Sequence, residues 1–342
     1  MLTRQRLAIA VIGSVAALSL AACSTVGATE PDAGGDGANG DYVHVVKITG
    51  IAWFDRMSKG VEDFASESGL AATQTGPATA DTELQVGIVQ SLIAKKPKAI
   101  GIVPLDPGAL ENVIKQAKDA GITVVTHEAP TIQNADADIE AFDNPVYGET
   151  IMNSLAECLG DSGDYVQFVG SLTSETHMAW ANAGYELQQS EYPGLNRISE
   201  PVESKDNADT AYTKTKQLLQ ANPGLRGFFG DSSQDLPGIA RAIQELGLQD
   251  DTCVFGTGVP SETSAFLEDG SADGIFLWDP ALAGHAVLAA AQIIAEGGKL
   301  ETGTDLGVPG YNSLVQSKDN PKTFFGNAPL ALTKENVGDY DF

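Results

Sequence analysis

The stretch ITGIAWFDRMSKGVEDFA, residues 48–65, joins two elements of different periodicity. It overlaps the end of an apolar run, residues 43–48, that is typical of a buried β-strand. Its own apolar residues then recur at spacings of three and four, which predicts an amphipathic helix: Phe54, Met57, Val61 and Phe64. Trp53 and Phe54 lie where the strand gives way to the helix, a place that usually favours small polar residues. We therefore expect a strand–turn–helix unit whose turn presents two aromatic rings.

The same unit recurs along the chain. Further short apolar runs are predicted as strands at residues 70–74, 99–103, 123–126, 165–169, 227–229, 253–255 and 274–277. Helical patterns lie between them, as after Asp106-Pro107, where Asp106 suits an N-cap and Pro107 the first helical position. Such alternation indicates βαβ units and largely parallel sheets. One set of units ends near Thr126 and another begins near Tyr165, so we expect two similar α/β lobes.

The N-terminal segment is typical of a bacterial export signal. Arg4 and Arg6 precede an apolar stretch that is shorter than the roughly 20 residues of a membrane span and ends in Ala21-Ala22-Cys23. Leu20–Cys23 resembles a lipobox, in which the cysteine becomes the first mature residue and carries lipid. We therefore expect a signal peptide at 1–22, a lipidated Cys23 with a flexible tether at 23–40, and anchoring outside the cell membrane. The alternative is an ordinary signal peptide with an incidental Cys23.

Composition limits the partners. The formal net charge is −26 and no basic patch is visible, so nucleic acid is not an expected partner. Cys158 and Cys253 are the other cysteines, and an oxidising compartment permits a disulfide between them, with two buried free thiols as an equal alternative. No Cys/His cluster has metal-ligand spacing, so neither a metal nor another cofactor is predicted.

Candidate binding residues follow the predicted strands, because ligands of open parallel sheets bind beyond the carboxyl ends of the strands. They are Lys47, Trp53, Phe54, Asp55, His127, Glu128, Thr173, His177, Asp231, Ser232, Gln234, Trp278 and Asp279. Aromatic rings stack on the apolar faces of a sugar, and carboxylates and amides form hydrogen bonds with its hydroxyls. A site matched to hydroxyls also rejects ligands that lack them. This mixture predicts a neutral polyhydroxylated ligand.

Several candidates have a purely structural alternative. Phe54, and to a lesser degree Trp53, would then pack into the core as a hydrophobic staple at the start of the helix. His127 and His177 would be satisfied loop histidines. Asp55 would pair with its neighbour Arg56 or cap the helix.

Several segments together resemble the type 1 periplasmic binding proteins that serve ABC importers. They are residues 47–54, 60–61, 101–107, 124–128, 142–148, 277–279 and the tail 333–342. Within that family the chain looks most similar to the ribose, rhamnose and autoinducer-2 receptors. The resemblance implies two Rossmann-like α/β lobes with parallel sheets, joined by a three-segment hinge, that close on a ligand. It further implies delivery to a membrane permease and its ATPase, by a protein expected to be a monomer.

The resemblance also implies lobe boundaries. Crossings are expected near residues 142–144, 278–280 and 306–310. The N-terminal lobe would then comprise residues 42–142 and 280–307, and the C-terminal lobe residues 143–279 and 308–342.

Some ligand-contacting positions of the family are matched in this chain, and others hold different residues. Lys47 matches a ligand-contacting lysine of autoinducer-2 receptors, and Glu128 stands where the receptors place an Asp. However, Thr176 and His177 replace an adjacent Asp and Gln, and Gly230-Asp231-Ser232 replaces Pro-Asp-Ala. A pentose, hexose, deoxy sugar or small polyol is therefore the expected ligand, with autoinducer-2 or another signal as the alternative.

Other function classes are poorly supported. Gly230-Asp-Ser-Ser233 faintly resembles the GDS-type hydrolase motif, but no histidine follows His285 to complete it, and no Gly-x-Ser-x-Gly elbow occurs. An enzyme is therefore not predicted. Sugar-responsive repressors of this fold carry a helix-turn-helix where this chain has its export signal. A sensor of the same fold is not separable from an importer subunit by sequence.

Overall fold

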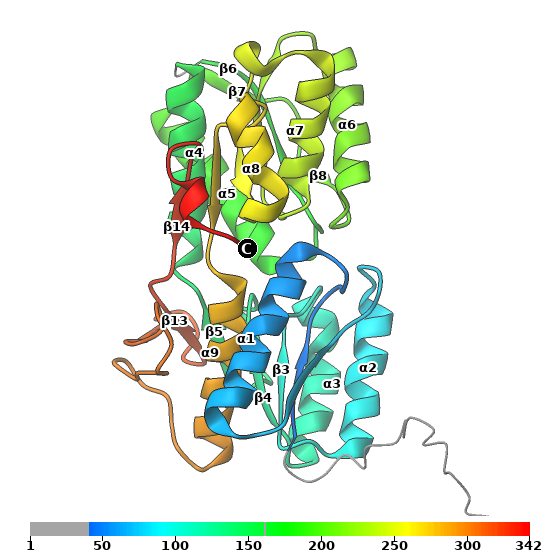
Figure 1. Ribbon diagram of the computed structural model, residues 1–342, viewed down its shortest axis with the longest axis vertical. Helices are drawn as coiled ribbons and strands as arrows, with labels where there is room; N and C mark the ends of the chain where they lie inside the picture. Colours follow the sequence, from blue (N-terminus) through cyan, green and yellow to red (C-terminus); the bar gives the residue numbers. More distant parts are fainter. Residues whose placement is uncertain (1–40, 161) are drawn as a thin grey trace, which may run out of the picture. The chain divides into compact units, whose positions relative to one another are not determined.

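The computed structural model describes residues 41–160 and 162–342, whose strands assemble into two separate sheets (Figure 1). Each sheet has seven strands, which run parallel except for one antiparallel strand at an edge of each sheet. Helices follow the parallel strands and cover the sheet faces. The structure therefore confirms the predicted α/β architecture of two parallel-sheet lobes.

The first sheet has the strand order β12-β13-β5-β4-β3-β1-β2. Its strands are β1 (Tyr42–Val45), β2 (Ala72–Thr75), β3 (Ala99–Ile102), β4 (Thr123–Thr126), β5 (Ala137–Glu140), β12 (Val315–Gln316) and β13 (Thr323–Phe325). Its helices are α1 (Ala52–Ser68), α2 (Thr82–Lys95), α3 (Pro107–Asp119) and α9 (Pro280–Ala295). Helices α1 and α9 pack together, as do α2 and α3, and the two pairs bury separate apolar clusters against the sheet.

The second sheet has the order β14-β11-β10-β9-β6-β7, with β8 also paired to β6. Its strands are β6 (Gly163–Val169), β7 (Leu195–Arg197), β8 (Val202–Glu203), β9 (Leu225–Gly230), β10 (Cys253–Thr257), β11 (Gly274–Leu277) and β14 (Leu330–Leu332). Its helices are α4 (Asn144–Leu159), α5 (Glu175–Glu191), α6 (Ala208–Ala221), α7 (Asp235–Leu246) and α8 (Pro260–Asp269), with short 3₁₀ turns η1 (Gln249–Asp251) and η2 (Val337–Asp339).

The opening unit of the sequence forms β1 and α1, with one change at the junction. Helix α1 begins at Ala52, so Trp53 and Phe54 occupy its first turn and not the preceding loop. Both are buried, at 4% and 1% exposure. The helix ends at Gly69, whose φ of 71° is the left-handed conformation that terminates many helices.

Close packing against α9 fixes the position of α1. A Cβ atom on Gly60 would lie 1.7 Å from the carbonyl oxygen of Ala281, so only glycine permits this approach. The contact lies at the start of α9, next to the chain segment that carries Trp278 and Asp279. The middle of α1 and the first turn of α9 are therefore held side by side.

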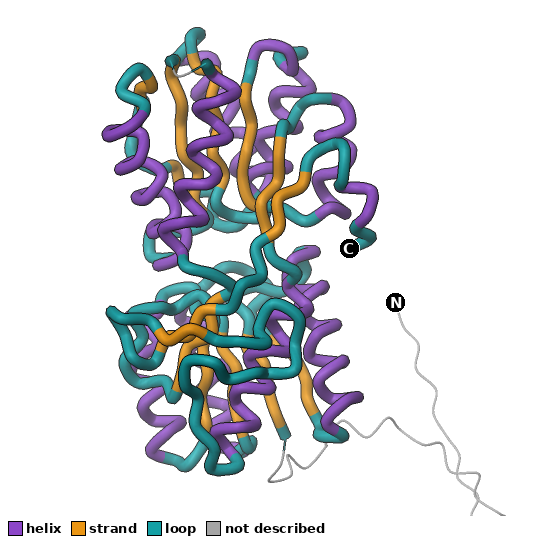
Figure 2. Tube along the Cα trace, turned by 90° about the vertical axis from the view of Figure 1, so that its left-hand side faces the viewer, coloured by secondary structure: helices purple, strands orange, loops and turns teal. Residues whose placement is uncertain are grey.

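The expected boundary at residue 307 is wrong. After α9 the chain stays with the first sheet, where β13 pairs in parallel with β5 and β12 pairs with β13. These strands cover what would otherwise be an open sheet edge. The chain passes to the second sheet only between β13 and β14, so the third crossing lies at residues 326–329. The other two passages run from β5 into α4 and from β11 into α9 (Figure 2).

The N-terminal predictions lie outside the described residues: the signal peptide at 1–22, the tether at 23–40 and lipidation at Cys23. Over the described ranges, no helix combines the length and apolar character that crossing a bilayer requires. Both sheets belong to one compact unit of the chain.

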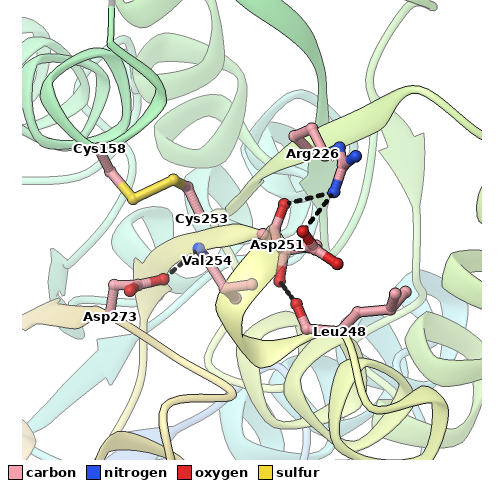
Figure 3. The surroundings of a disulfide bond; sticks show 8 residues. Cys158, Arg226, Leu248, Asp251, Cys253, Val254 and Asp273 are labelled. Carbon is pink, nitrogen blue, oxygen red and sulfur yellow. Dashed lines mark hydrogen bonds and ion pairs between the residues drawn. A yellow bond between two sulfur atoms is a disulfide. The ribbon is translucent and has the colours of Figure 1, made fainter.

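Cys158 and Cys253 form a disulfide. The bond joins α4 to the start of β10, with the two Cα atoms 6.0 Å apart (Figure 3). The sequence separation is 95 residues, so the bond closes a long loop within the second lobe. Of the two alternatives that the sequence left open, the paired one is present.

Reduction of this disulfide should lower the free energy of unfolding by about 2–4 kcal/mol, because a crosslink over a long loop restricts the unfolded chain. The measurement is the urea midpoint of residues 37–342 with and without dithiothreitol. The double variant Cys158→Ser/Cys253→Ser should show the lower midpoint and no response to dithiothreitol. Equal midpoints for the oxidised and reduced protein would contradict the prediction.

Candidate functional site

A narrow cavity lies beyond the carboxyl ends of the strands and draws residues from both lobes. Its lining is Lys47, Ile51, Trp53, Phe54, Glu128, His177, Trp180, Asp206, Asp231, Ser232, Ser233, Thr257 and Trp278. The volume enclosed among them is about 20 Å³, well below the range of small-molecule sites. All three tryptophans of the chain are among these residues. The cavity therefore combines a small volume with aromatic and ionisable walls.

An ion pair forms the polar wall of the first lobe. Lys47 Nζ lies 2.9 Å from Glu128 Oε2, and both side chains are almost fully buried. Burial acts to lower the pKa of Lys47, but the charges of Glu128 and Asp206 outweigh it, so that the pKa is raised and the ammonium is retained. Thr176 of the second lobe also donates to Glu128 Oε2, at 3.5 Å.

Glu128 has a strained backbone. Its φ is 61°, a left-handed conformation that residues other than glycine rarely adopt. Such strain persists where surrounding structure imposes it and is concentrated at functional sites. Here it accompanies the turn after β4 that brings the Glu128 carboxylate to Lys47.

Unpartnered carboxylate oxygens form the polar wall of the second lobe. Within the described residues, neither oxygen of Asp231 has a hydrogen-bond partner, and neither does Oδ2 of Asp206. Asp206 Oδ1 accepts a hydrogen bond of 2.6 Å from Ser232 Oγ. Burial, and secondarily the charge of Asp235, raises the pKa of Asp231 well above its usual range. These three oxygens are acceptors that a ligand can satisfy.

The aromatic rings pack edge to face around Trp278. The Trp53 and Trp278 ring centroids are 4.7 Å apart, and those of Trp180 and Trp278 are 5.8 Å apart. Trp180 is oriented by its indole N–H, which donates to Asn144 Oδ1 at 2.6 Å. The indole N–H of Trp278 is buried without a partner in the part of the chain that the structure describes. The aromatic wall thus also offers a donor.

Eight of the predicted binding residues line the cavity: Lys47, Trp53, Phe54, Glu128, His177, Asp231, Ser232 and Trp278. The ring of His177 is held by its Nδ1, which accepts from the Gly170 amide at 3.1 Å. Burial, and then the charge of Lys47, lowers its pKa well below the ordinary value, so the imidazole is neutral. The Trp53 and Phe54 rings are buried, as the structural alternative expects, and they also line the cavity.

Five predicted residues lie outside the lining. Asp55 is exposed on α1, and Thr173 lies on an outer loop. Gln234 donates to Glu262 at 2.9 Å, and Asp279 binds Arg56 through both oxygens at 2.8 and 2.6 Å. Arg56 thus pairs with Asp279, and its pairing with Asp55, which the sequence left open, is wrong.

His127 is the fifth of these residues and packs against Trp278, one of the residues that line the cavity. Its Nδ1 lies 2.6 Å from the Ile139 carbonyl oxygen, and its ring centroid is 5.7 Å from that of Trp278. Burial lowers its pKa.

Five lining residues were missed: Ile51, Trp180, Asp206, Ser233 and Thr257. Thr257 ends β10 and would have been found had the strand been predicted two residues longer. Trp180 lies three residues after His177 and shares its helix face. Asp206 follows β8, which at two residues is too short to give a periodic pattern. Among the described residues, no group of three or more His, Cys, Asp or Glu could hold a metal ion.

Known solute-binding proteins share this fold. Structural neighbours include LsrB from Clostridium saccharobutylicum in complex with AI-2, with a TM-score of 0.82 and 21% identity over 88% of this chain and 100% of that one. Another is an ABC transporter solute-binding protein from Clostridium phytofermentas with bound L-rhamnose, at TM-score 0.82 and 21% identity over 89% and 98%. At these identities the likeness establishes the fold.

Curated relatives have a similarly low sequence identity to this chain. A D-apiose import binding protein of Actinobacillus succinogenes is 23% identical over 288 residues, which cover 83% of this chain and 88% of the relative. A xylitol-binding protein of Mycolicibacterium smegmatis is 26% identical over 273 residues, covering 76% and 72%. The family model described as periplasmic binding protein domain matches residues 42–299, and the chain belongs to that family.

Proposed function

We propose that this protein is an extracytoplasmic solute-binding protein of an ABC importer and that it binds a neutral monosaccharide, deoxy sugar or polyol between its lobes. The observation that carries the proposal is the set of buried, unpartnered oxygens on Asp231 and Asp206, opposite the Lys47–Glu128 pair. A buried acceptor without a donor is costly, and a hydroxyl is both donor and acceptor. A polyhydroxylated ligand therefore satisfies both walls at once.

The aromatic residues fit the same ligand. The rings of Trp53, Trp180 and Trp278 give flat apolar surfaces on which the CH faces of a sugar or polyol pack. Relatives that are named for D-apiose, xylitol and ribose support this ligand class.

The transport role extends the proposal to partners. Hinge closure over the ligand would present both lobes to a membrane permease, which works with its ATPase. Lipid on Cys23 would hold the protein, as a monomer, to the outer face of the membrane. We propose binding without catalysis, because Ser232 Oγ is engaged by Asp206 and His177 Nδ1 by a backbone amide.

Autoinducer-2 or another signal is the second candidate. The AI-2 complex of LsrB has the same fold, and the buried Lys47 favours this alternative. Thr176 and His177 oppose it, since they stand where those receptors have an Asp and a Gln.

A thermal-shift screen of residues 37–342 tests the proposal. The panel contains pentoses, hexoses, deoxy sugars, polyols and autoinducer-2. At a hundred times its Kd, a ligand adds about 2.7 kcal/mol, which raises Tm by a few degrees. A hit among sugars or polyols is expected. A response to autoinducer-2 alone would indicate that the protein serves signal uptake. No response from folded, ligand-free protein would refute the ligand class.

Asp231→Asn should have opposite effects on binding and on stability. Binding of the identified ligand should weaken about 10- to 100-fold, because Asn replaces one carboxyl oxygen with an N–H donor and so removes an acceptor for a ligand hydroxyl. Isothermal titration calorimetry measures this loss. The exposed Asp250→Asn in the same lobe is the matched control and should bind normally.

The same variant should be more stable than the parent at pH 7.5, by about 1 kcal/mol. The folded protein holds the Asp231 pKa above its unfolded value of about 3.9, so this carboxyl lowers stability increasingly as pH rises from that value through the folded pKa. The difference in Tm between variant and parent should therefore shrink toward pH 4. A difference that does not vary with pH would show that Asp231 is not a strained buried acid.

A further inference from the structure

Arg56 links the aromatic wall of the cavity to a contact outside it. It lies on α1, one turn after Trp53, and its guanidinium binds both oxygens of Asp279 at 2.8 and 2.6 Å. Asp279 follows Trp278 directly and caps α9 by accepting from the Ala281 amide at 2.9 Å. The ion pair therefore joins the two helix starts that carry Trp53 and Trp278.

The same guanidinium lies over the ring of the C-terminal residue. Arg56 Cζ is 4.3 Å from the centroid of Phe342. The Phe342 carbonyl oxygen accepts from the Ser261 amide of α8 at 2.9 Å, and its ring packs against Tyr340. The tail is thus attached to the second lobe, while Arg56 belongs to the first. Figure 1 shows the C-terminus between α8 and α1.

Near this contact, acidic residues of the two lobes repel one another and oppose closure. Burial raises the pKa of Glu262 on α8, and the charge of Asp55 on α1 raises it further, so two acids of opposite lobes face each other here. Arg56 adds a cation on α1, where its hydrogen bond to Asp279 and the charges of Asp279 and Asp341 raise its pKa. In a chain of net charge −26, such a cation offsets repulsion between the lobes.

We propose that Arg56 and Phe342 form a latch that stabilises the closed arrangement of the two lobes without touching the ligand. Asp279 holds the guanidinium in place, and the Phe342 ring docks on it when the lobes meet. A cation–π contact at a partly exposed site shifts a closed-to-open ratio about two- to fivefold. Slower ligand release follows from the latch; that consequence rests on the proposed function, whereas the latch itself does not.

The test measures interlobe distance in the absence of ligand. Nitroxide labels on Lys115→Cys and Gln220→Cys, exposed positions on α3 and α6, report closure of residues 37–342 by pulsed dipolar spectroscopy. Phe342→Ala should lower the closed-to-open ratio two- to fivefold, and Phe342→Trp should preserve it. Because the Phe342 side chain is only partly buried, the fold is expected to survive either change.

Two controls isolate the contact. Arg241 lies 4.2 Å from the Tyr212 ring centroid within the second lobe, so Tyr212→Leu removes a matched pair that does not join the lobes and should leave the ratio unchanged. Combined with Arg56→Met, Phe342→Ala should add nothing further.

An unchanged ratio in Phe342→Ala, or additive effects of Arg56→Met and Phe342→Ala, would overturn the latch. Because no ligand is present, this result is independent of the sugar screen. If a sugar binds, its dissociation from Phe342→Ala should be about two- to fivefold faster.

Discussion

The close approach of α1 to the start of α9 is the constraint on which the site depends. Gly60 allows the two helices to meet without a side chain between them. As a result, Trp53 and Trp278 pack edge to face, and Arg56 reaches Asp279 with both of its hydrogen bonds. One backbone contact thus positions the aromatic wall of the cavity and the ion pair beside it, although the residues lie more than two hundred positions apart.

The cavity contains buried ionisable groups, and their burial lowers the stability of the fold. Asp231 and Asp206 are held without complete hydrogen bonding, and Glu128 keeps a left-handed backbone. Each feature reduces stability, and each turns a polar atom toward the same small space. Proteins retain such costs where a ligand compensates for them. The disulfide and the extensive apolar cores on both sheets offset this loss of stability.

Much of this arrangement follows from local pattern. The βα units were predictable because apolar periodicity identifies buried strands and helix faces, and because strand ends converge at one edge of a parallel sheet. This rule found Lys47, Glu128 and Asp231. It failed for β5, whose Asp138 and Glu140 are buried acids that interrupt an apolar pattern. Burial raises the pKa of Asp138 to about 7, which lessens the charge that the sheet must hold.

By itself, the sequence determined the fold class, the two-lobed organisation and the chemical character of the cavity, since these depend on periodicity and on the residue types that follow each strand. The tertiary structure alone decided which polar residues share the cavity. Asp279 and Gln234 follow strands as Asp231 does, yet Arg56 and Glu262 engage them elsewhere. Only the fold brought Asp206 and Trp180 into the lining and assigned β13 to the first sheet. Pairing between distant segments depends on side-chain packing and register, which no local pattern encodes.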